Sequence, residues 1–164
     1  MNNELLKLIP ILRRYAYTFA GNLHDADDLV QNTLERVLKK PPPEGVELAK
    51  WAFRICRNLW IDEYRAATTR QNATEEPHLQ AQATTDGERD VTHQIEFKQV
   101  YEAMQALNDD QRTVMALVTI EGMSYQEAAT VIDKPVGTVM SRLARARAAL
   151  TMHLQTMRTP MASR

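Results

Sequence analysis

Residues 124–150 constrain the fold of this chain more than any other segment, because they specify two short helices and the turn that joins them. Ser124 is followed three residues later by Glu127, and this spacing is a capping box that predicts the start of a helix. Residues 133–135 (Asp-Lys-Pro) then interrupt the helical pattern. Aspartate tolerates turn geometry, and proline disfavours helix at the residue before it while suiting the first turn of the next helix.

The second of these helices has one apolar stripe, formed at helical spacing by Val139, Leu143, Ala146 and Leu150. The residues of this helix that we expect to contact DNA lie opposite the stripe or beside it: Thr138, Ser141, Arg142, Arg145 and Arg147. From Lys134 onward the chain has six basic residues and no acidic one. A helix-turn-helix with a second helix that is apolar inward and basic outward is typical of proteins that enter the major groove. The alternative is a solvated basic helix in an ordinary bundle.

Composition favours a helical protein without membrane spans. Of the 164 residues 44% are hydrophobic and only 5 are glycine. The net charge is −1, so binding to nucleic acid must depend on local charge asymmetry. The single cysteine, Cys56, excludes an internal disulfide and is expected to be a buried, inert thiol. The apolar run 5–12 is interrupted by Lys7 and Pro10, and we see no signal peptide, so we expect a soluble, cytoplasmic protein.

The chain divides by composition into two helical parts. Residues 1–65 and 95–155 have helix-period patterns, whereas 66–94 has hardly any large apolar residue and a net charge of −3. Such a segment cannot bury enough surface to order itself, so we expect a flexible acidic linker there and a tail at 156–164. The fold class that follows is all-α, with an N-terminal module of three or four helices and a C-terminal helix-turn-helix module.

Three helices are expected in the first module. The first covers residues 4–20, with a kink or early break at Pro10. Asp25 is the expected N-cap of the second helix, which residues 41–43 (Pro-Pro-Pro) stop. The third helix is expected at about residues 47–64.

The third helix combines basic and aromatic side chains. Basic residues recur at i, i+4 and i+7, as Lys50, Arg54 and Arg57, and the aromatic residues beside them are Phe53, Trp60 and Tyr64. Cations that follow a phosphate backbone, together with rings that stack on unpaired bases, suit single-stranded DNA. The alternative is that the aromatic side chains belong to the hydrophobic core.

A polar face on the second helix contrasts with this basic surface. It is formed by Asp28, Gln31, Asn32 and Glu35, on the side away from the apolar stripe of that helix. Such a face is either a docking site for another protein or merely solvated, and the sequence leaves both interpretations open.

Five segments, in their order and spacing, resemble the extracytoplasmic-function (ECF) sigma factors of bacterial RNA polymerase. They are residues 24–31 (HDADDLVQ), 51–58 (WAFRICRN) with Asp62, 110–112 (DQR), 121–129 (EGMSYQEAA) and 135–147 (PVGTVMSRLARAR). Together they cover both modules.

The resemblance implies a promoter-directing protein without catalytic activity, metal or cofactor. It implies that the face with Asp28, Gln31, Asn32 and Glu35 docks on the clamp helices of the polymerase β′ subunit. It implies that Lys50, Arg54, Arg57 and Asn58, with the loop before them, capture the melted minus-ten element. The second module would read the minus-thirty-five element and contact the β flap. An anti-sigma factor is a further expected partner.

The chain departs from the family pattern at four places. Asn32 stands where an acidic residue is common, and Asn108 stands where many members have proline. Residues 132–133 (Ile-Asp) replace a frequent Leu-Gly at the turn, which then requires Asp133 to adopt the left-handed conformation or accept strain. Met140 stands where some members have arginine.

Three other functions are weaker alternatives. An enzyme is disfavoured because the known short catalytic and nucleotide-binding motifs are absent and the four histidines lie in separate segments. A sigma-like decoy that sequesters an anti-sigma factor would usually be fused to a receiver domain and would not need Arg142, Arg145 and Arg147. A dimeric repressor would give the basic, aromatic third helix no function.

Overall fold

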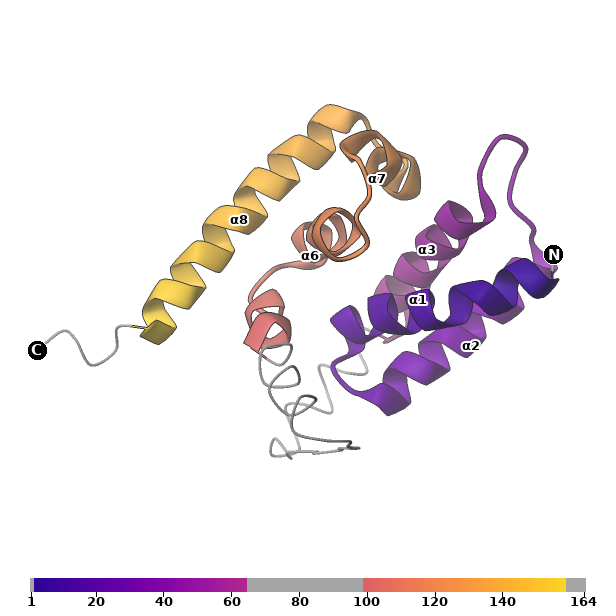
Figure 1. Cartoon of the computed structure of the whole chain (residues 1–164), viewed down its shortest axis with the longest axis horizontal. Helices are drawn as coiled ribbons and strands as arrows, with labels where there is room; N and C mark the ends of the chain where they lie inside the picture. The colour runs from indigo at the N-terminus through magenta and orange to yellow at the C-terminus, as the bar shows by residue number, and fades with distance from the viewer. Residues whose placement is uncertain (1, 65–98, 159–164) are drawn as a thin grey trace, which may run out of the picture.

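A computed structural model describes residues 2–64 and 99–158, and every regular element in these ranges is a helix. The elements are α1 (Asn2–Ala20), α2 (Leu23–Lys39), α3 (Leu48–Leu59), the π-helical turn η1 (Trp60–Tyr64), α6 (Asp109–Met115), the π-helical turn η2 (Ala116–Ile120), α7 (Tyr125–Ile132) and α8 (Val136–Arg158). Figure 1 shows the first module in indigo to magenta and the second in orange to yellow, with the two packed together. The all-α fold class in two helical modules is confirmed.

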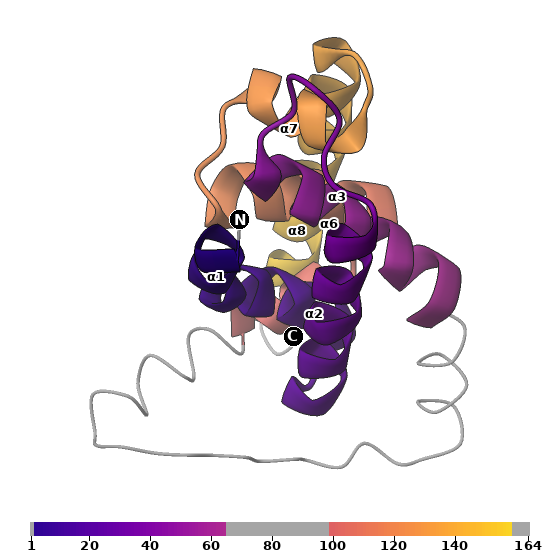
Figure 2. The same ribbon diagram turned by 90° about the vertical axis from the view of Figure 1, so that its right-hand side faces the viewer.

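The first module is a bundle of α1, α2 and α3, whose apolar faces meet in a core that continues into the second module. Leu12, Phe19 and Leu29 are among its fully buried side chains. Residues 41–43 end α2 as expected, and the loop that they begin leads into α3. The view in Figure 2 shows α1, α2 and α3 together, with α7 lying against α3.

Two predictions about helix boundaries in this module were wrong. The early break expected at Pro10 does not occur: helix α1 runs continuously from Asn2 to Ala20, with Leu5 and Leu12 buried on either side of the proline. The N-cap of α2 is Asn22 and not Asp25: the Asn22 side chain accepts a hydrogen bond of 2.8 Å from the backbone N–H of Asp25. Gly21, at φ +87°, ends α1 just before, so the cap comes earlier than expected.

The second module contains the helix-turn-helix that the sequence predicts. Ser124 and Glu127 form both hydrogen bonds of a capping box at the start of α7, and these hydrogen bonds lower the pKa of Glu127. Asp133 adopts the left-handed conformation, with φ 58° and ψ 47°, and ends α7. Helix α8 then begins at Val136, directly after Pro135.

Three of the four residues predicted to form the inward stripe of α8 are buried, with Val139, Leu143 and Ala146 at 1% exposure or less, and Leu150 is half-buried. Beyond it, α8 extends to Arg158, three residues into the predicted tail, and its second half projects from the module (Figure 1). The predicted linker at 66–94 lies outside the described residues, as do 95–98 and 159–164. Among the described residues no helix is long and apolar enough to cross a membrane.

Candidate nucleic-acid interface

The outward surface of α8 presents the residues that were predicted to contact duplex DNA. Ser141, Arg145 and Arg147 are exposed, and Thr138 is half-buried. The Ser141 hydroxyl donates a hydrogen bond of 3.3 Å to the backbone carbonyl of Thr138, within the first turns of the helix. Polar and cationic groups therefore lie on the exposed face of the N-terminal half of α8, and the opposite face of this half is buried in the module.

Arg142 differs from its neighbours because it contacts the rest of its own module. Its Nη1 lies 3.6 Å from Oδ1 of Asp110 on α6, and its side chain is only 22% exposed. This ion pair between α8 and α6 orients Arg142 along the module surface. Of the five predicted duplex contacts, Arg142 is the one that has an ionic partner among the described residues of its own module.

The basic face of α3 lies against the second module, which the sequence analysis did not predict. Arg54 donates two hydrogen bonds to carbonyls in the last turn of α7, 2.5 Å to Thr130 and 3.1 Å to Val131. The last carbonyls of a helix lack intrahelical donors and carry partial negative charge, so a guanidinium fits there well. The guanidinium also lies 5.4 Å from the centroid of the Trp51 ring.

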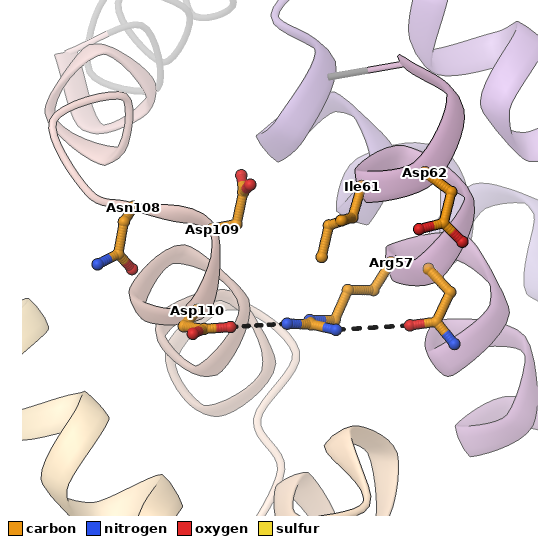
Figure 3. A pocket seen from close by; sticks show the side chains of 7 residues that line it. Arg57, Ile61, Asp62, Asn108, Asp109 and Asp110 are labelled. Carbon is orange, nitrogen blue, oxygen red and sulfur yellow. Dashed lines mark hydrogen bonds and ion pairs between the residues drawn. The ribbon is translucent and has the colours of Figure 1, made fainter. Parts of the chain in front are cut away.

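Arg57, one turn further along α3, contacts the start of α6 (Figure 3). Its Nη2 donates a 2.7 Å hydrogen bond to Oδ1 of Asp110, and its Nε donates one of 3.2 Å to the Thr113 hydroxyl. On the other side, Nη1 lies 3.4 Å from Oδ1 of Asn58. Arg57, Asn58 and Asp110 are among the residues that line a pocket of about 490 Å³ between the modules.

Lys50 completes the covered basic face. Its Nζ lies 2.9 Å from a Glu47 carboxylate oxygen and 3.8 Å from one of Glu127 on α7. Of the four residues predicted to hold single-stranded DNA, only Asn58 is exposed. The structure thus brings all four onto one helix and covers the three cations with the second module.

Two of the three aromatic side chains predicted beside the basic stripe fit the core interpretation, and the third, Tyr64, is half-buried. Phe53 is 3% and Trp60 4% exposed, and the Trp60 indole donates a 3.3 Å hydrogen bond to Asp109. Trp60 packs at 6.0 Å from Phe19 between ring centroids. In this arrangement neither ring is available to stack on a base.

The polar face of α2 is exposed at Asp28, Gln31 and Glu35 and half-buried at Asn32. Tyr64, from η1, covers Asn32: its hydroxyl donates a 2.6 Å hydrogen bond to Asp28 and accepts one from the Asn32 amide. Partial burial and the Asp28 carboxylate raise the pKa of Tyr64. Tyr64 was predicted only as one of the aromatic residues on the third helix, and its contact with Asp28, which orients that acidic side chain, was not expected.

Three further residues with structural roles, Asn108, Gln111 and Arg112, were not predicted to have them. Asn108 is the N-cap of α6 and forms a capping box with Gln111, a signal that the Asn-x-x-Gln spacing carried. Arg112 is buried and donates hydrogen bonds to the carbonyls of Leu107 and Phe19, and its burial lowers its pKa. No local pattern marks an arginine of this kind, since its partner carbonyl on α1 is distant in sequence.

The prediction of a buried cysteine is confirmed. Cys56 is fully buried on α3, and burial raises its pKa to about 12, so the thiol is not poised to react. Within residues 2–64 and 99–158, no three His, Cys, Asp or Glu side chains lie close enough to hold a metal ion.

Family models match both modules. The model described as Sigma-70 region 2 matches residues 6–70, and that described as Sigma-70, region 4 matches residues 97–150. The chain is 35% identical over 153 residues to the ECF RNA polymerase sigma factor EcfG of Rhodopseudomonas palustris, which covers 92% of this chain and 83% of the relative.

Solved structures agree with the sequence relatives. The fold resembles the sigma factor RpoE in its complex with the anti-sigma factor NepR from Bartonella quintana, with a TM-score of 0.71 and 28% identity over 94% of this chain and 96% of that one. It also resembles CnrH in complex with the cytosolic domain of CnrY, with a TM-score of 0.69 and 25% identity over 94% of this chain and 87% of that one. The chain therefore belongs to the ECF family of RNA polymerase sigma factors.

Proposed function

We propose that this sigma factor divides promoter recognition between its modules, with residues 95–155 reading the upstream promoter element as duplex DNA. The observation that carries this proposal is the contrast around α8, where Ser141 and Arg145 are exposed opposite the fully buried Leu143. A helix fixed in this way can enter a major groove and place its guanidinium groups at base edges or phosphates. Thr138, Arg142 and Arg147 flank the contact.

Residues 1–65 are proposed to hold the melted downstream element. Lys50, Arg54 and Arg57 supply charge along one helix, and the exposed Asn58 amide can donate to and accept from unpaired base edges. Asn58→Ala is expected to slow transcription from duplex promoters and to be partly rescued on templates that are already melted across the downstream element. Permanganate footprinting measures the bubble directly. An Asn58→Ala protein that opens the bubble as fast as the parent would exclude this role.

The acidic face of α2 is proposed to dock on the β′ clamp helices of core polymerase, and the second module on the β flap. Asp28, Gln31 and Glu35 are free of the core of the first module, with Asn32 beside them, so they can contact a partner without unfolding the bundle. We propose an anti-sigma factor as a second partner, because the similar sigma factor RpoE was solved in complex with the anti-sigma factor NepR. Action in the cytoplasm, by binding and not by catalysis, follows from this role.

Transcription in vitro tests the proposed function. Purified chain is added to core polymerase and a library of genomic fragments, and the start sites are sequenced. We expect initiation at a defined set of promoters that share an upstream and a downstream element. A decoy for an anti-sigma factor, or a repressor, would bind its own partner without conferring promoter-specific initiation on core polymerase, and that result would overturn the proposal.

A further inference from the structure

Opposite charges meet where the two modules pack together. On the first module the groups are four cations, which we call the latch cations: Arg14, Lys50, Arg54 and Arg57. Arg14 contacts both carboxylate oxygens of Glu121, at 2.6 and 3.1 Å, and the Glu121 side chain is only 3% exposed. Every latch cation thus has a carboxylate or a helix-end carbonyl of the second module within 4.0 Å.

Each module also caps a helix of the other. Arg54 from α3 satisfies carbonyls at the end of α7, as described above. In return, Gln105 donates a 3.1 Å hydrogen bond to the Thr18 carbonyl at the end of α1, and Arg112 reaches the Phe19 carbonyl at 3.5 Å. Helix ends need external donors when they are buried, so these exchanged caps favour the packed arrangement specifically.

We propose that the packed arrangement is a self-inhibited state, in which the second module occupies the side chains that the first module needs for single-stranded DNA. This inference rests on the proposed function only for the role of Arg54 and Arg57 in binding DNA. The geometry makes the two uses exclusive: the donors of Arg54 point at the Thr130 and Val131 carbonyls, and those of Arg57 at Asp110 and Thr113. These donors can bind a phosphate or base only after their hydrogen bonds to the second module break.

The chemistry of the latch suits a reversible state. The interface is partly apolar, since the buried core continues from one module into the other and the Tyr17 and Tyr101 rings lie 4.9 Å apart between centroids. Its partly exposed ion pairs are screened by salt, so added salt weakens the packing. The side chains of Arg14 and Asp110 are about half exposed, which leaves water access for opening. Core polymerase or promoter DNA can then shift the chain toward an open state by binding that state alone.

Neighbouring arginines on α1 provide a matched pair of variants. Arg14 binds Glu121 in the second module, whereas Arg13 binds Asp27 within the first module, at 2.7 Å. Neither belongs to a proposed DNA or polymerase surface. Donor and acceptor dyes are attached at Glu44→Cys, in the loop before α3, and at Gln126→Cys on α7, two exposed positions on either side of the contact between α3 and α7, in a Cys56→Ala background. Energy transfer in the free, full-length chain then reports separation of the modules.

We expect Arg14→Ala to lower energy transfer, Arg13→Ala to leave it unchanged, and added salt to lower it in the parent chain. Affinity for a random-sequence single-stranded DNA should rise roughly threefold or more in Arg14→Ala, because the open state, which can bind DNA, is no longer the less populated one. Asp110→Asn gives the same test from the other module, should Arg14→Ala fail to fold.

Two results would overturn the inference. One is equal energy transfer in the parent chain, Arg14→Ala and Asp110→Asn, which would mean that the latch does not hold the modules. The other is an opened variant with unchanged affinity for single-stranded DNA, which would mean that closure hides no binding group. Promoter-specific transcription with core polymerase is measured separately, so either failure leaves the proposed function to be judged by its own assay.

Discussion

The two basic helices of this molecule, α8 and α3, differ in what covers them. Both have one apolar face in their own module and cations on the remaining surface. On α8 the cations Arg145 and Arg147 face solvent, whereas on α3 Arg54 and Arg57 face the other module. Helical periodicity shows which face is buried within a module, but a second, polar interface can still cover the opposite face.

The largest effect that we expect tests the inward side of α8. Leu143 is 1% exposed, so Leu143→Ala should destabilise the second module by about 2–5 kcal/mol through lost burial and the cavity left behind. Chemical denaturation followed by circular dichroism measures this loss. Ala144→Ser, on the exposed side of the same turn, is the control and should cost far less. A similar loss at both positions would contradict the assignment of the two faces.

The outward side of α8 should affect DNA binding and not stability. Arg145→Ala should cost about 1–3 kcal/mol of binding if the guanidinium reads a base, with relaxed preference at one position of the upstream element. Binding to a promoter library with single-base changes measures this preference. A loss that is uniform across all sequences would make Arg145 a phosphate contact, and an unchanged affinity would remove this face from the interface.

Much of the second module could be predicted from local sequence. The Ser124 capping box and the left-handed Asp133 are both present, because caps and turns are determined by a few adjacent residues. The same reasoning placed the α2 cap three residues late, since it gave Asp25 more weight than the Gly21-Asn22 pair. The covered face of α3 could not be predicted, because its partners Thr130, Val131 and Asp110 are more than 50 residues away in sequence.

The acidic face of α2 offers an intermediate case, exposed like α8 but partly covered by Tyr64. Asp28→Lys should weaken binding to core polymerase several-fold, and Gln31→Ala should do so more mildly, because both side chains lie outside the core. A pull-down with purified core polymerase compares them with Asp27→Asn, a neighbouring exposed carboxylate. Unchanged binding by a folded Asp28→Lys, Gln31→Ala double variant would show that this face is only solvated.

The smallest expected effect is a change in the salt dependence of DNA binding, measured for one variant on α3 and one on α8. If Arg57 neutralises one phosphate of single-stranded DNA, Arg57→Ala should reduce the slope of log K against log salt by about 0.7. Arg147→Ala on α8 is the matched control, because it should leave the slope for single-stranded DNA unchanged while reducing the slope for duplex promoter DNA by about 0.9.

Arg57→Ala also removes the ion pair with Asp110, so opening of the modules and loss of the phosphate contact act in opposite directions on affinity. The slope of log K against log salt distinguishes opening of the modules from loss of the phosphate contact. In the parent chain, rising salt also opens the latch, which makes its measured slope shallower than the number of phosphate contacts alone would give. Measuring Arg57→Ala in the Arg14→Ala background removes this contribution from both chains. An unchanged slope there would mean that Arg57 serves only the interface between the modules.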